Sequence, residues 1–268
     1  MQEFSVLMSV YKKDNPKWLK EAINSIFAQS VKPTEVVVVC DGPLTADLEV
    51  VLTEYNGKII LHRLAKNSGL GEALKQGVEK CSCELIARMD SDDISLPDRF
   101  EKQLSYFSQN PQTVVLGGQI QEIDGETLKP ISIRKVPITD KAIKKYIKSR
   151  SPFNHMAVMY KKSKVLKAGS YGNYYFMQDY FLWAHMAANG DKMANLPDII
   201  VNARVNDALY KRRGGWGYFK RSWAISSELL QLGLISYPRH LFNLGVRFCA
   251  QVLMPNKVRS IFYKKVLR

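Results

Sequence analysis

The chain has 268 residues, of which 46% are hydrophobic and 24% charged. This is the composition of a globular protein that can bury a substantial core, and it argues against a disordered chain, a repeat array or a small disulfide scaffold. The formal net charge of +14 is concentrated at the C-terminal end, because residues 211–268 hold twelve lysines and arginines against one acid, Glu228.

The cysteines and the N-terminus give expectations about the cellular compartment. The four cysteines are too irregularly spaced for a disulfide framework or a zinc site, and they are Cys40, Cys81, Cys83 and Cys249. Reduced thiols in a cytoplasmic protein are the simplest interpretation. The first residues carry an acid and no basic segment, and no apolar run approaches the roughly 18 residues that span a bilayer. We therefore expect a cytoplasmic protein without a membrane span.

Short β-branched runs alternate with helically spaced hydrophobic residues over the first 90 positions. The pattern predicts strands at 4–10, 35–40, 58–64 and 84–89, with helices around 18–27, 48–52 and 70–78. Such alternation is typical of a parallel, doubly wound sheet. In such sheets the ligand lies beyond the carboxyl ends of the strands, so residues just after each strand are candidates for the site.

Beyond a predicted helix at 97–107 the pattern changes. Three short segments look like antiparallel or mixed strands around an Asp124-Gly125 turn, and they are 114–116, 119–123 and 131–133. A helix through Ile143 and Ile147 follows, then a strand at 156–160, a helix at 179–188 and a strand at 199–205. Helical segments are expected in the tail at 216–232, 241–253 and 258–267.

Three aspartates, Asp90, Asp92 and Asp93, follow the predicted fourth strand and precede Pro97. One interpretation is an acidic loop that caps the next helix. However, three carboxylates within four residues repel one another unless a cation neutralises them. Hard oxygen ligands of this kind suit Mg²⁺ or Mn²⁺, which also bind substrate phosphates, so a nucleoside diphosphate is the natural partner.

A second candidate is the segment Gln178-Asp179-Tyr180 at the start of a predicted helix. Asp179 is either a helix N-terminal acid or a general base that removes a proton from an acceptor hydroxyl. Such a base, acting while a metal stabilises a departing diphosphate, gives an in-line displacement with inversion. The usual phosphate loops are missing, since the chain has no GxxxxGK[ST] and residues 69–74 fail the last glycine of GxGxxG. A dinucleotide-binding fold is therefore disfavoured.

These motifs resemble those of glycosyltransferase family 2. The aspartates at 90, 92 and 93 look like its DxD motif, and Gln178-Asp179-Tyr180 with Leu182-Trp183 resembles its base motif. The order of the motifs agrees over about residues 4–213, including Ser9-Val10-Tyr11, Asp41-Gly42-Pro43 and Asn67-Ser68-Gly69. The chain is most similar to bacterial enzymes that build capsule, exopolysaccharide or O-antigen units.

The resemblance implies an α/β fold of the GT-A type. This is a Rossmann-like, mostly parallel central sheet with flanking helices, a small antiparallel or mixed second sheet, and here a C-terminal helical extension. We expect a catalytic domain at 1–210, with a nucleotide-binding half at 1–118 and an acceptor half at 119–210. Residues 211–268 would form a basic, amphipathic helical region.

The resemblance also implies roles for single residues. Ser9, Tyr11 and Asp41 would bind the nucleoside, and Arg88 and Asp90 would lie near the ribose and sugar. Asn67 and Asp93 would also bind the nucleotide sugar. Asp90 and Asp92 would bind the metal, and Asp179 would be the base. Two positions depart from the family. Cys40 stands where many members have an aspartate, and Gln178 replaces a glutamate that often precedes the base.

Other residues suggest contacts with the donor phosphates. His155 is either such a contact or a structural hydrogen-bonding residue. Arg204, Arg212 and Arg213 carry guanidinium groups that match phosphate oxygens, and the glycines after Arg213 permit a loop to close. A solvated basic turn is the alternative, and we favour the diphosphate clamp.

The basic tail carries an apolar stripe at Leu241, Leu244, Phe248 and Val252. The stripe could simply pack on the catalytic body, but the excess of positive charge favours an anionic membrane surface. Nucleic acid is a competing partner for such charge, and we expect none because no recognised nucleic-acid module accompanies it.

Together these features predict an inverting glycosyltransferase that uses Mn²⁺ or Mg²⁺. It would transfer a sugar from a nucleoside diphosphate, most simply a UDP-hexose, to a hydroxyl of a lipid-linked saccharide at the inner face of the cytoplasmic membrane. Two alternatives are a sugar nucleotidyltransferase, although 10–14 lack the glycines of its loop, and a non-enzymatic basic membrane or nucleic-acid adaptor.

Overall fold

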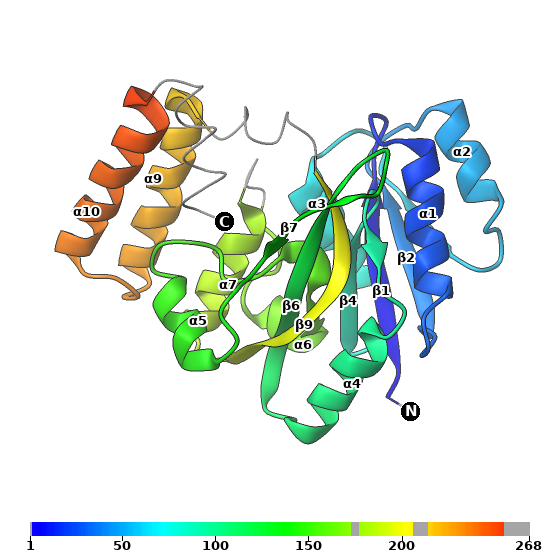
Figure 1. Cartoon of the computed structure of the whole chain (residues 1–268), viewed down its shortest axis with the longest axis horizontal. Coiled ribbons are helices and arrows are strands. Elements are labelled where there is room, and N and C mark those ends of the chain that lie inside the picture. Colours follow the sequence, from blue (N-terminus) through cyan, green and yellow to red (C-terminus); the bar gives the residue numbers. More distant parts are fainter. Residues whose placement is uncertain (1, 173–176, 206–213, 255–268) are drawn as a thin grey trace.

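One mixed sheet with helices on both faces forms the body of the protein (Figure 1). The structure, a computed structural model, describes residues 2–172, 177–205 and 214–254. In the described chain the sheet has nine strands in the order β3-β2-β1-β4-β8-β6-β9-β5, with β7 paired to β6. The strands are β1 (Phe4–Val10), β2 (Glu35–Cys40), β3 (Ile60–Arg63), β4 (Leu85–Asp90), β5 (Ile94–Ser95), β6 (Thr113–Asp124), β7 (Pro130–Arg134), β8 (Met159–Lys161) and β9 (Lys192–Val205).

Helices lie on the two faces of the sheet and at one end of the molecule. They are α1 (Pro16–Phe27), α2 (Ala46–Thr53), α3 (Leu70–Lys80), α4 (Arg99–Gln109), α5 (Asp140–Tyr146), α6 (Lys162–Lys167), α7 (Gln178–Ala188), α9 (Trp216–Gln231) and α10 (Tyr237–Phe248). Of these, α9 and α10 lie beyond α5 and α7, at the end of the molecule away from α1 and α2 (Figure 1). A short 3₁₀ turn covers His155–Ala157, and a π-helical turn at Cys249–Leu253 extends α10.

The first half is doubly wound, as the sequence predicts. β1 pairs in parallel with β2 and β4, and β2 pairs in parallel with β3. The valine run of β2 explains why both faces are covered, because Val36 and Val38 pack into the core on one face while Val37 and Val39 pack into the core on the other. The carboxyl ends of β1, β2 and β4 therefore meet at one edge of the sheet.

Local sequence also fixes where α1 begins. The Asn15 side chain accepts hydrogen bonds from the backbone N–H groups of Lys17 and Trp18, at 2.9 and 3.3 Å, and Pro16 occupies the first turn. The helix then buries Leu19 and Ile23 against the sheet. One end of α1 therefore lies directly after β1, at the edge where the parallel strands end.

The second half extends the same sheet. β8 runs antiparallel to β4 and β6, while β6 and β9 are parallel. The expectation of a small second sheet is therefore corrected in the described chain, since these strands continue the central one. The segments 114–116 and 119–123, expected as two strands, form the single strand β6. At its centre a Cβ on Gly117 or Gly118 would meet Asn195 or Ile200 at 2.1 or 2.6 Å, so glycine allows β9 to approach closely.

Other differences from the expected elements are local. β5, α6 and the first half of β9 were not expected, because β5 has only two residues and residues 192–198 lack a β-branched run. The proposed division into halves at 118/119 falls within β6. Helices α9 and α10 agree with the expected tail helices, whereas the segment at 258–267 lies outside the described residues. Among the described helices, none has the length and apolarity to cross a membrane.

Candidate active site

Asp90, Asp92 and Asp93 form an acidic cluster where β4 ends. One carboxylate oxygen from each lies within 4.8 Å of the others. Asp93 is buried, and its Oδ2 has no hydrogen-bond partner, whereas Asp90 and Asp92 are partly exposed. A buried carboxylate oxygen without a donor is costly unless a cation neutralises it. The geometry therefore fits a divalent metal with hard oxygen ligands.

The carboxylates of the cluster repel one another. Burial, followed by the charges of Asp90 and Asp14, raises the pKa of Asp92 to about 7. Burial and the neighbouring carboxylates raise the pKa of Asp93 well above its usual range. Each shift means that like charges and lost hydration disfavour the ionised form. A bound cation would relieve this repulsion.

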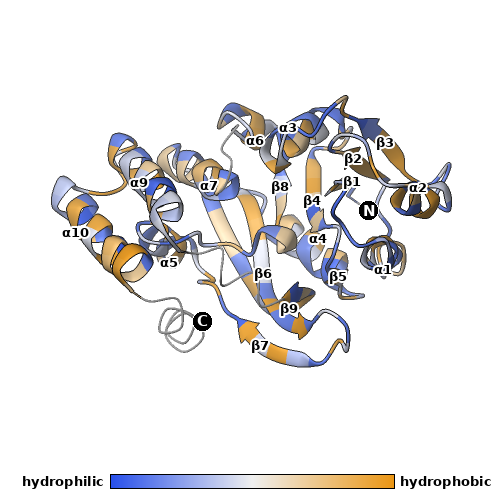
Figure 2. Cartoon of the chain, turned by 90° about the horizontal axis from the view of Figure 1, so that it is seen from above, coloured by the Kyte–Doolittle hydropathy of each residue, from blue (hydrophilic) through white to orange (hydrophobic). Residues whose placement is uncertain are grey.

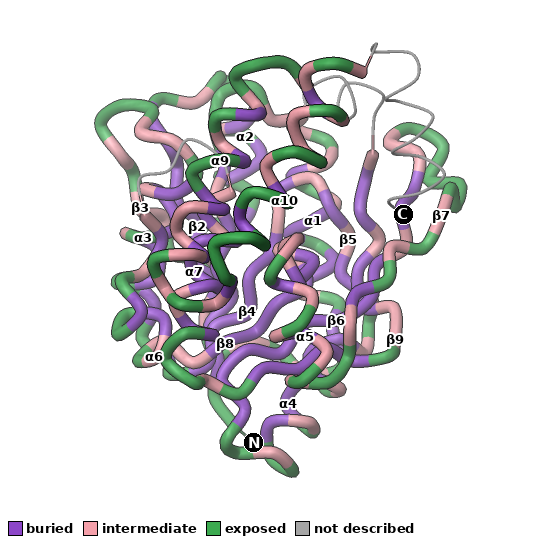
Figure 3. The backbone as a smooth tube through the Cα atoms, turned by 90° about the vertical axis from the view of Figure 1, so that its left-hand side faces the viewer, coloured by how far each residue is buried: buried purple, intermediate pink, exposed green. Residues whose placement is uncertain are grey.

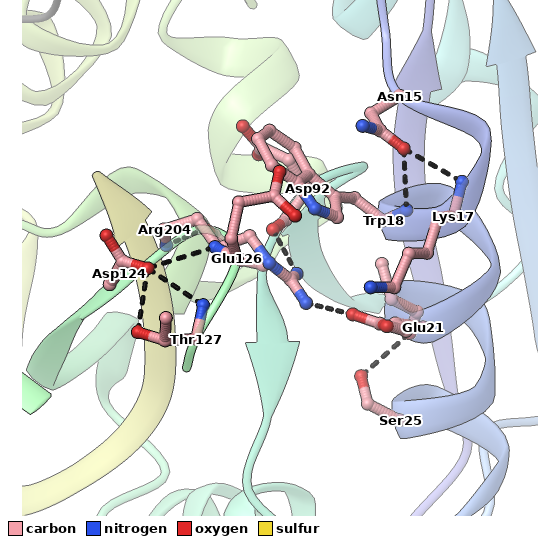
Figure 4. A network of polar contacts seen from close by, with 12 residues as sticks. Asn15, Lys17, Trp18, Glu21, Ser25, Asp92, Asp124, Glu126, Thr127 and Arg204 are labelled. Atoms are coloured by element: carbon pink, nitrogen blue, oxygen red, sulfur yellow. Dashed lines mark hydrogen bonds and ion pairs between the residues drawn. The ribbon is translucent and has the colours of Figure 1, made fainter. Parts of the chain in front are cut away.

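Arg204 and Glu21 hold the backbone of this acidic loop (Figure 4). The Arg204 guanidinium donates to the Asp92 carbonyl and to the Glu21 carboxylate, and it lies over the ring of Trp18 at 5.5 Å. The Arg204 backbone N–H donates to Asp93 Oδ1 at 2.8 Å. Arg204 was expected to contact the donor phosphates, and the structure gives its side chain these contacts with α1 and the loop.

Arg88 connects the acidic cluster with the interior. Its Nη2 donates to Asp90 Oδ1, while Nε and Nη1 are buried without a hydrogen-bond partner. The carbonyl of Arg88 in turn accepts a hydrogen bond of 2.7 Å from buried Arg99. Buried guanidinium groups are normally paired, so the two unpartnered nitrogens are suited to an anionic ligand.

Asp41 organises the loop that follows β3. Its carboxylate accepts from Asn67 Nδ2 at 2.9 Å and from the backbone N–H groups of Ser68 and Gly69 at 2.6 and 3.0 Å. Gly42 has φ +84°, and a Cβ there would lie 2.5 Å from the Asn67 nitrogen, so glycine is required where the loops after β2 and β3 touch. Asp41 and Asn67 are thus brought together.

The other nucleoside-binding candidates lie at the same edge. Ser9 is opposite Asp90 in the β1–β4 register, and Tyr11 follows β1 with its side chain 39% exposed. Cys40 ends β2 and is fully buried, and burial raises the pKa of its thiol to about 11. The thiol is therefore an inert core group rather than a substitute for a carboxylate.

Asp179 is the second residue of α7, and it lies within the electrostatic reach of Arg88. Ser151 Oγ donates to Asp179 Oδ2 at 3.2 Å. Burial raises the pKa of Asp179, while hydrogen bonds from the Tyr180 backbone and Ser151 and the charge of Arg88 oppose that rise. A carboxylate with a raised pKa that is still held near positive charge suits general-base chemistry.

His155 begins a short 3₁₀ turn and packs against Trp183 of α7. Its Nε2 is 2.9 Å from the Tyr171 hydroxyl, and its ring makes an edge contact with Trp183. Burial and then the charge of Arg88 lower the pKa of His155 well below its usual value. The imidazole is neutral at physiological pH, which favours a hydrogen-bonding role over charge pairing with phosphate.

The sequence interpretation missed two polar residues of this region. Asp14 Oδ2 accepts from the Tyr11 N–H at 3.0 Å and from Ser91 Oγ at 2.8 Å, and burial raises its pKa to about 6. Asp14 could have been predicted, because it lies in the loop directly after β1. Tyr171, whose pKa is raised by burial, carried no signal because its partner His155 is 16 residues away. Arg212 and Arg213 lie outside the described residues.

The doubly wound sheet and the acidic cluster at its carboxyl edge are typical of α/β enzymes that bind a ligand beyond the ends of their parallel strands. The sequence matches the family described as Glycosyl transferase family 2 over residues 5–168. The chain belongs to this family and is a glycosyltransferase. The alternatives of a nucleotidyltransferase and a non-enzymatic adaptor are therefore excluded.

Known relatives match nearly the whole chain. An uncharacterized glycosyltransferase of Haemophilus influenzae is 41% identical over 99% of both chains. The amylovoran biosynthesis glycosyltransferase AmsE of Erwinia amylovora is 36% identical over 98% of both. An Escherichia coli protein named UDP-Gal:alpha-D-GlcNAc-diphosphoundecaprenol beta-1,3-galactosyltransferase is 37% identical over 99% of this chain and 97% of its own.

Solved structures support the fold. Residues 1–349 of S. aureus TarS, in complex with UDP-GlcNAc, superpose with a TM-score of 0.71 at 18% identity, covering 99% of this chain and 76% of that chain. At this identity the likeness concerns the fold alone. It confirms the expected GT-A architecture with helices at the C-terminal end.

Proposed function

We propose that the protein transfers a hexose from a UDP-sugar to a hydroxyl of a lipid-linked saccharide, with inversion at the anomeric carbon, during synthesis of a bacterial surface polysaccharide. The observation that carries this proposal is the position of Arg88, which pairs with Asp90 of the acidic cluster and whose charge lowers the pKa of Asp179. The buried guanidinium group of Arg88 thus links the candidate donor site with the candidate base. The names of the AmsE and E. coli relatives and the UDP-GlcNAc ligand of TarS support the choice of substrates.

Different residues of the chain have different roles in an in-line displacement. Asp179 accepts the proton of the acceptor hydroxyl as its oxygen forms a bond to the anomeric carbon. The bond from that carbon to the diphosphate oxygen breaks, and the electron pair leaves with UDP. The unpartnered nitrogens of Arg88 donate to the departing oxygens, while Ser9, Tyr11 and the Asp41–Asn67 loop line the nucleoside edge.

The acidic cluster would hold the divalent cation, Mn²⁺ or Mg²⁺, through Asp90 and Asp92, with Asp93 beneath them. When bound, the cation supplies Lewis-acid stabilisation of the diphosphate leaving group. Arg204 and Glu21 keep the Asp92 backbone in place for this role. His155 would donate or accept a hydrogen bond at the sugar side.

The acceptor half at 119–210 and the basic region at 211–268 complete the proposal. A lipid-linked acceptor lies at a membrane surface, so we place the enzyme peripherally at the cytoplasmic face through its basic tail. The exposed apolar residues of α10 support this placement and are analysed below.

A donor and acceptor screen tests the function. Purified protein is incubated with Mn²⁺, a panel of UDP- and GDP-hexoses and a short-chain diphosphate lipid that carries one GlcNAc. Transfer from a UDP-hexose, with the anomeric configuration inverted by NMR, is the expected result. Retained configuration, or transfer that chelators leave unchanged, would contradict the mechanism.

A further inference from the structure

Helix α10 is amphipathic, but it turns polar side chains toward the body of the protein and apolar side chains toward solvent. Its polar residues His240 and Asn243 are buried, at 7% and 5% exposure, whereas Leu241, Phe242 and Val246 are 51–60% exposed. A helix on a water-soluble body normally turns its apolar side inward. Figure 3, in which α10 lies toward the viewer, shows exposed turns along this helix, and Figure 2 shows hydrophobic residues over much of it.

The inward contacts of α10 are specific. His240 Nδ1 is 2.9 Å from Ser226 Oγ of α9. Asn243 Nδ2 donates to the Lys148 carbonyl at 2.9 Å, and Arg247 donates to the Ser149 carbonyl at 2.8 Å. These hydrogen bonds fix the rotation of the helix, so the outward apolar side is part of the fold.

The apolar surface continues onto α9. Trp216 and Trp223 are 52% and 50% exposed, and the Trp216 ring lies 6.3 Å from that of Phe248 at the end of α10. We call the set Trp216, Trp223, Tyr237, Leu241, Phe242 and Val246 the tail surface. Exposed apolar side chains gathered on two neighbouring helices are typical of an interaction site.

Charge identifies the kind of partner. Residues 214–254 contain four lysines and arginines and one acid, and that acid, Glu228, is 2.9 Å from His185. Exposed Lys220 lies between the two tryptophans in sequence, and Arg239 stacks on Phe242 with its Cζ 5.4 Å from the ring. Two copies of this basic surface would repel each other, whereas anionic lipid headgroups complement it. Tryptophan and tyrosine beside apolar residues are typical of the headgroup region.

We propose that the tail surface inserts into the headgroup region of an anionic lipid bilayer, with α10 lying in the plane of the membrane. The inference deepens the proposed function and rests on its lipid-linked acceptor. Helix α10 binds the carbonyls of Lys148 and Ser149, and Ser151 of the same segment donates to Asp179. The lipid-facing helix therefore packs directly behind the segment that contacts the candidate base.

The test compares two triple variants. Leu241→Gln, Phe242→Gln and Val246→Gln are combined in one protein, and the matched control combines Val50→Gln, Ile60→Gln and Leu166→Gln, which are 41–63% exposed elsewhere. Co-sedimentation uses vesicles of phosphatidylglycerol with phosphatidylcholine and vesicles of phosphatidylcholine alone. We expect the wild type and the control to bind the anionic vesicles, and the tail-surface variant to bind on the order of tenfold more weakly.

Activity separates this inference from the proposed function. The tail-surface variant should keep its circular dichroism, its UDP binding and its transfer to a water-soluble acceptor, and should lose transfer to an acceptor embedded in vesicles. Equal vesicle binding by the wild type and the variant would overturn the inference. So would a wild type that does not bind vesicles but forms a dimer, if the variant is monomeric. Loss of transfer to every acceptor, with vesicle binding intact, would instead contradict the proposed function.

Discussion

Arg204, at the end of β9, forms an ion pair with Glu21 of α1 across the acidic loop that carries Asp92. The Arg204 side chain is 1% exposed, so burying its positive charge without Glu21 would be energetically costly. A pair that joins the first helix to the last strand of the sheet fixes the loop between them. The geometry of the candidate metal site therefore depends on an ion pair between two residues outside the acidic cluster.

Replacing Glu21→Gln should destabilise the protein by about 1–3 kcal/mol, because a buried guanidinium loses its charged acceptor. Urea unfolding gives this value. Glu54→Gln is the matched control, since its ion pair with Lys20 has side chains that are 47% and 42% exposed and should contribute less than about 1 kcal/mol. Equal effects of the two substitutions would contradict a structural role for Glu21.

Replacing Asp92→Ala should weaken Mn²⁺-dependent UDP binding by more than about tenfold, since even outer-shell partners of a metal contribute that much. Calorimetric titration of UDP with and without Mn²⁺ measures the difference. Asp47→Ala, at an exposed position of α2, should leave binding unchanged. Unaltered metal-dependent binding in the Asp92 variant would remove this residue from the metal site.

Replacing Asp179→Asn should reduce transfer by at least about 10²-fold while UDP binding persists, because the amide cannot accept the hydroxyl proton. Steady-state transfer and nucleotide titration on the same preparation provide the comparison. Transfer near the wild-type rate would show that another group is the base.

Replacing Ser151→Ala should move the acidic limb of the pH–rate profile to higher pH. Asp179 must be ionised to act as base, so activity falls as pH decreases through its pKa, which burial already raises above its usual value. The Ser151 hydrogen bond lowers this pKa, and its loss raises it further. The dependence of kcat/KM on pH measures the shift, with exposed Ser105→Ala as control. A shift to lower pH would contradict the assignment.

Replacing Gly77→Ala should cost about 1–3 kcal/mol, because overpacking forces neighbours to move. The added Cβ would lie 2.3 Å from Leu7 Cδ1 and 2.9 Å from Val39 Cγ2, between α3 and the sheet. Gly217→Ala in α9 meets nothing within 4 Å and should instead stabilise the helix by about 0.5–1 kcal/mol. Thermal unfolding of both variants tests whether close packing explains the first glycine.

Features that depend on neighbouring residues could be predicted from the sequence. The valine run of β2 and the aspartates after β4 are visible in short windows, and each lies where expected. Their positions at one sheet edge follow from the rule that parallel strands end together. The family motifs added the order in which these segments occur.

Long-range pairings could not be predicted in this way. Glu21 and Arg204 are separated by 183 residues, and no local pattern reveals that one neutralises the other. The rotation of α10 was equally hidden, since an apolar stripe with helical spacing is compatible with packing inward or outward. The inward contacts of His240, Asn243 and Arg247 decide between these orientations.

The dependence of Asp92 on Arg204 also bears on how the protein matures during synthesis. The acidic loop leaves the ribosome first, and the arginine that shapes it follows 112 residues later. A nascent chain can thus assemble its early parallel strands before β9, which carries this arginine, has joined the sheet. Premature termination before residue 204 would therefore leave the acidic loop without the arginine that holds its backbone.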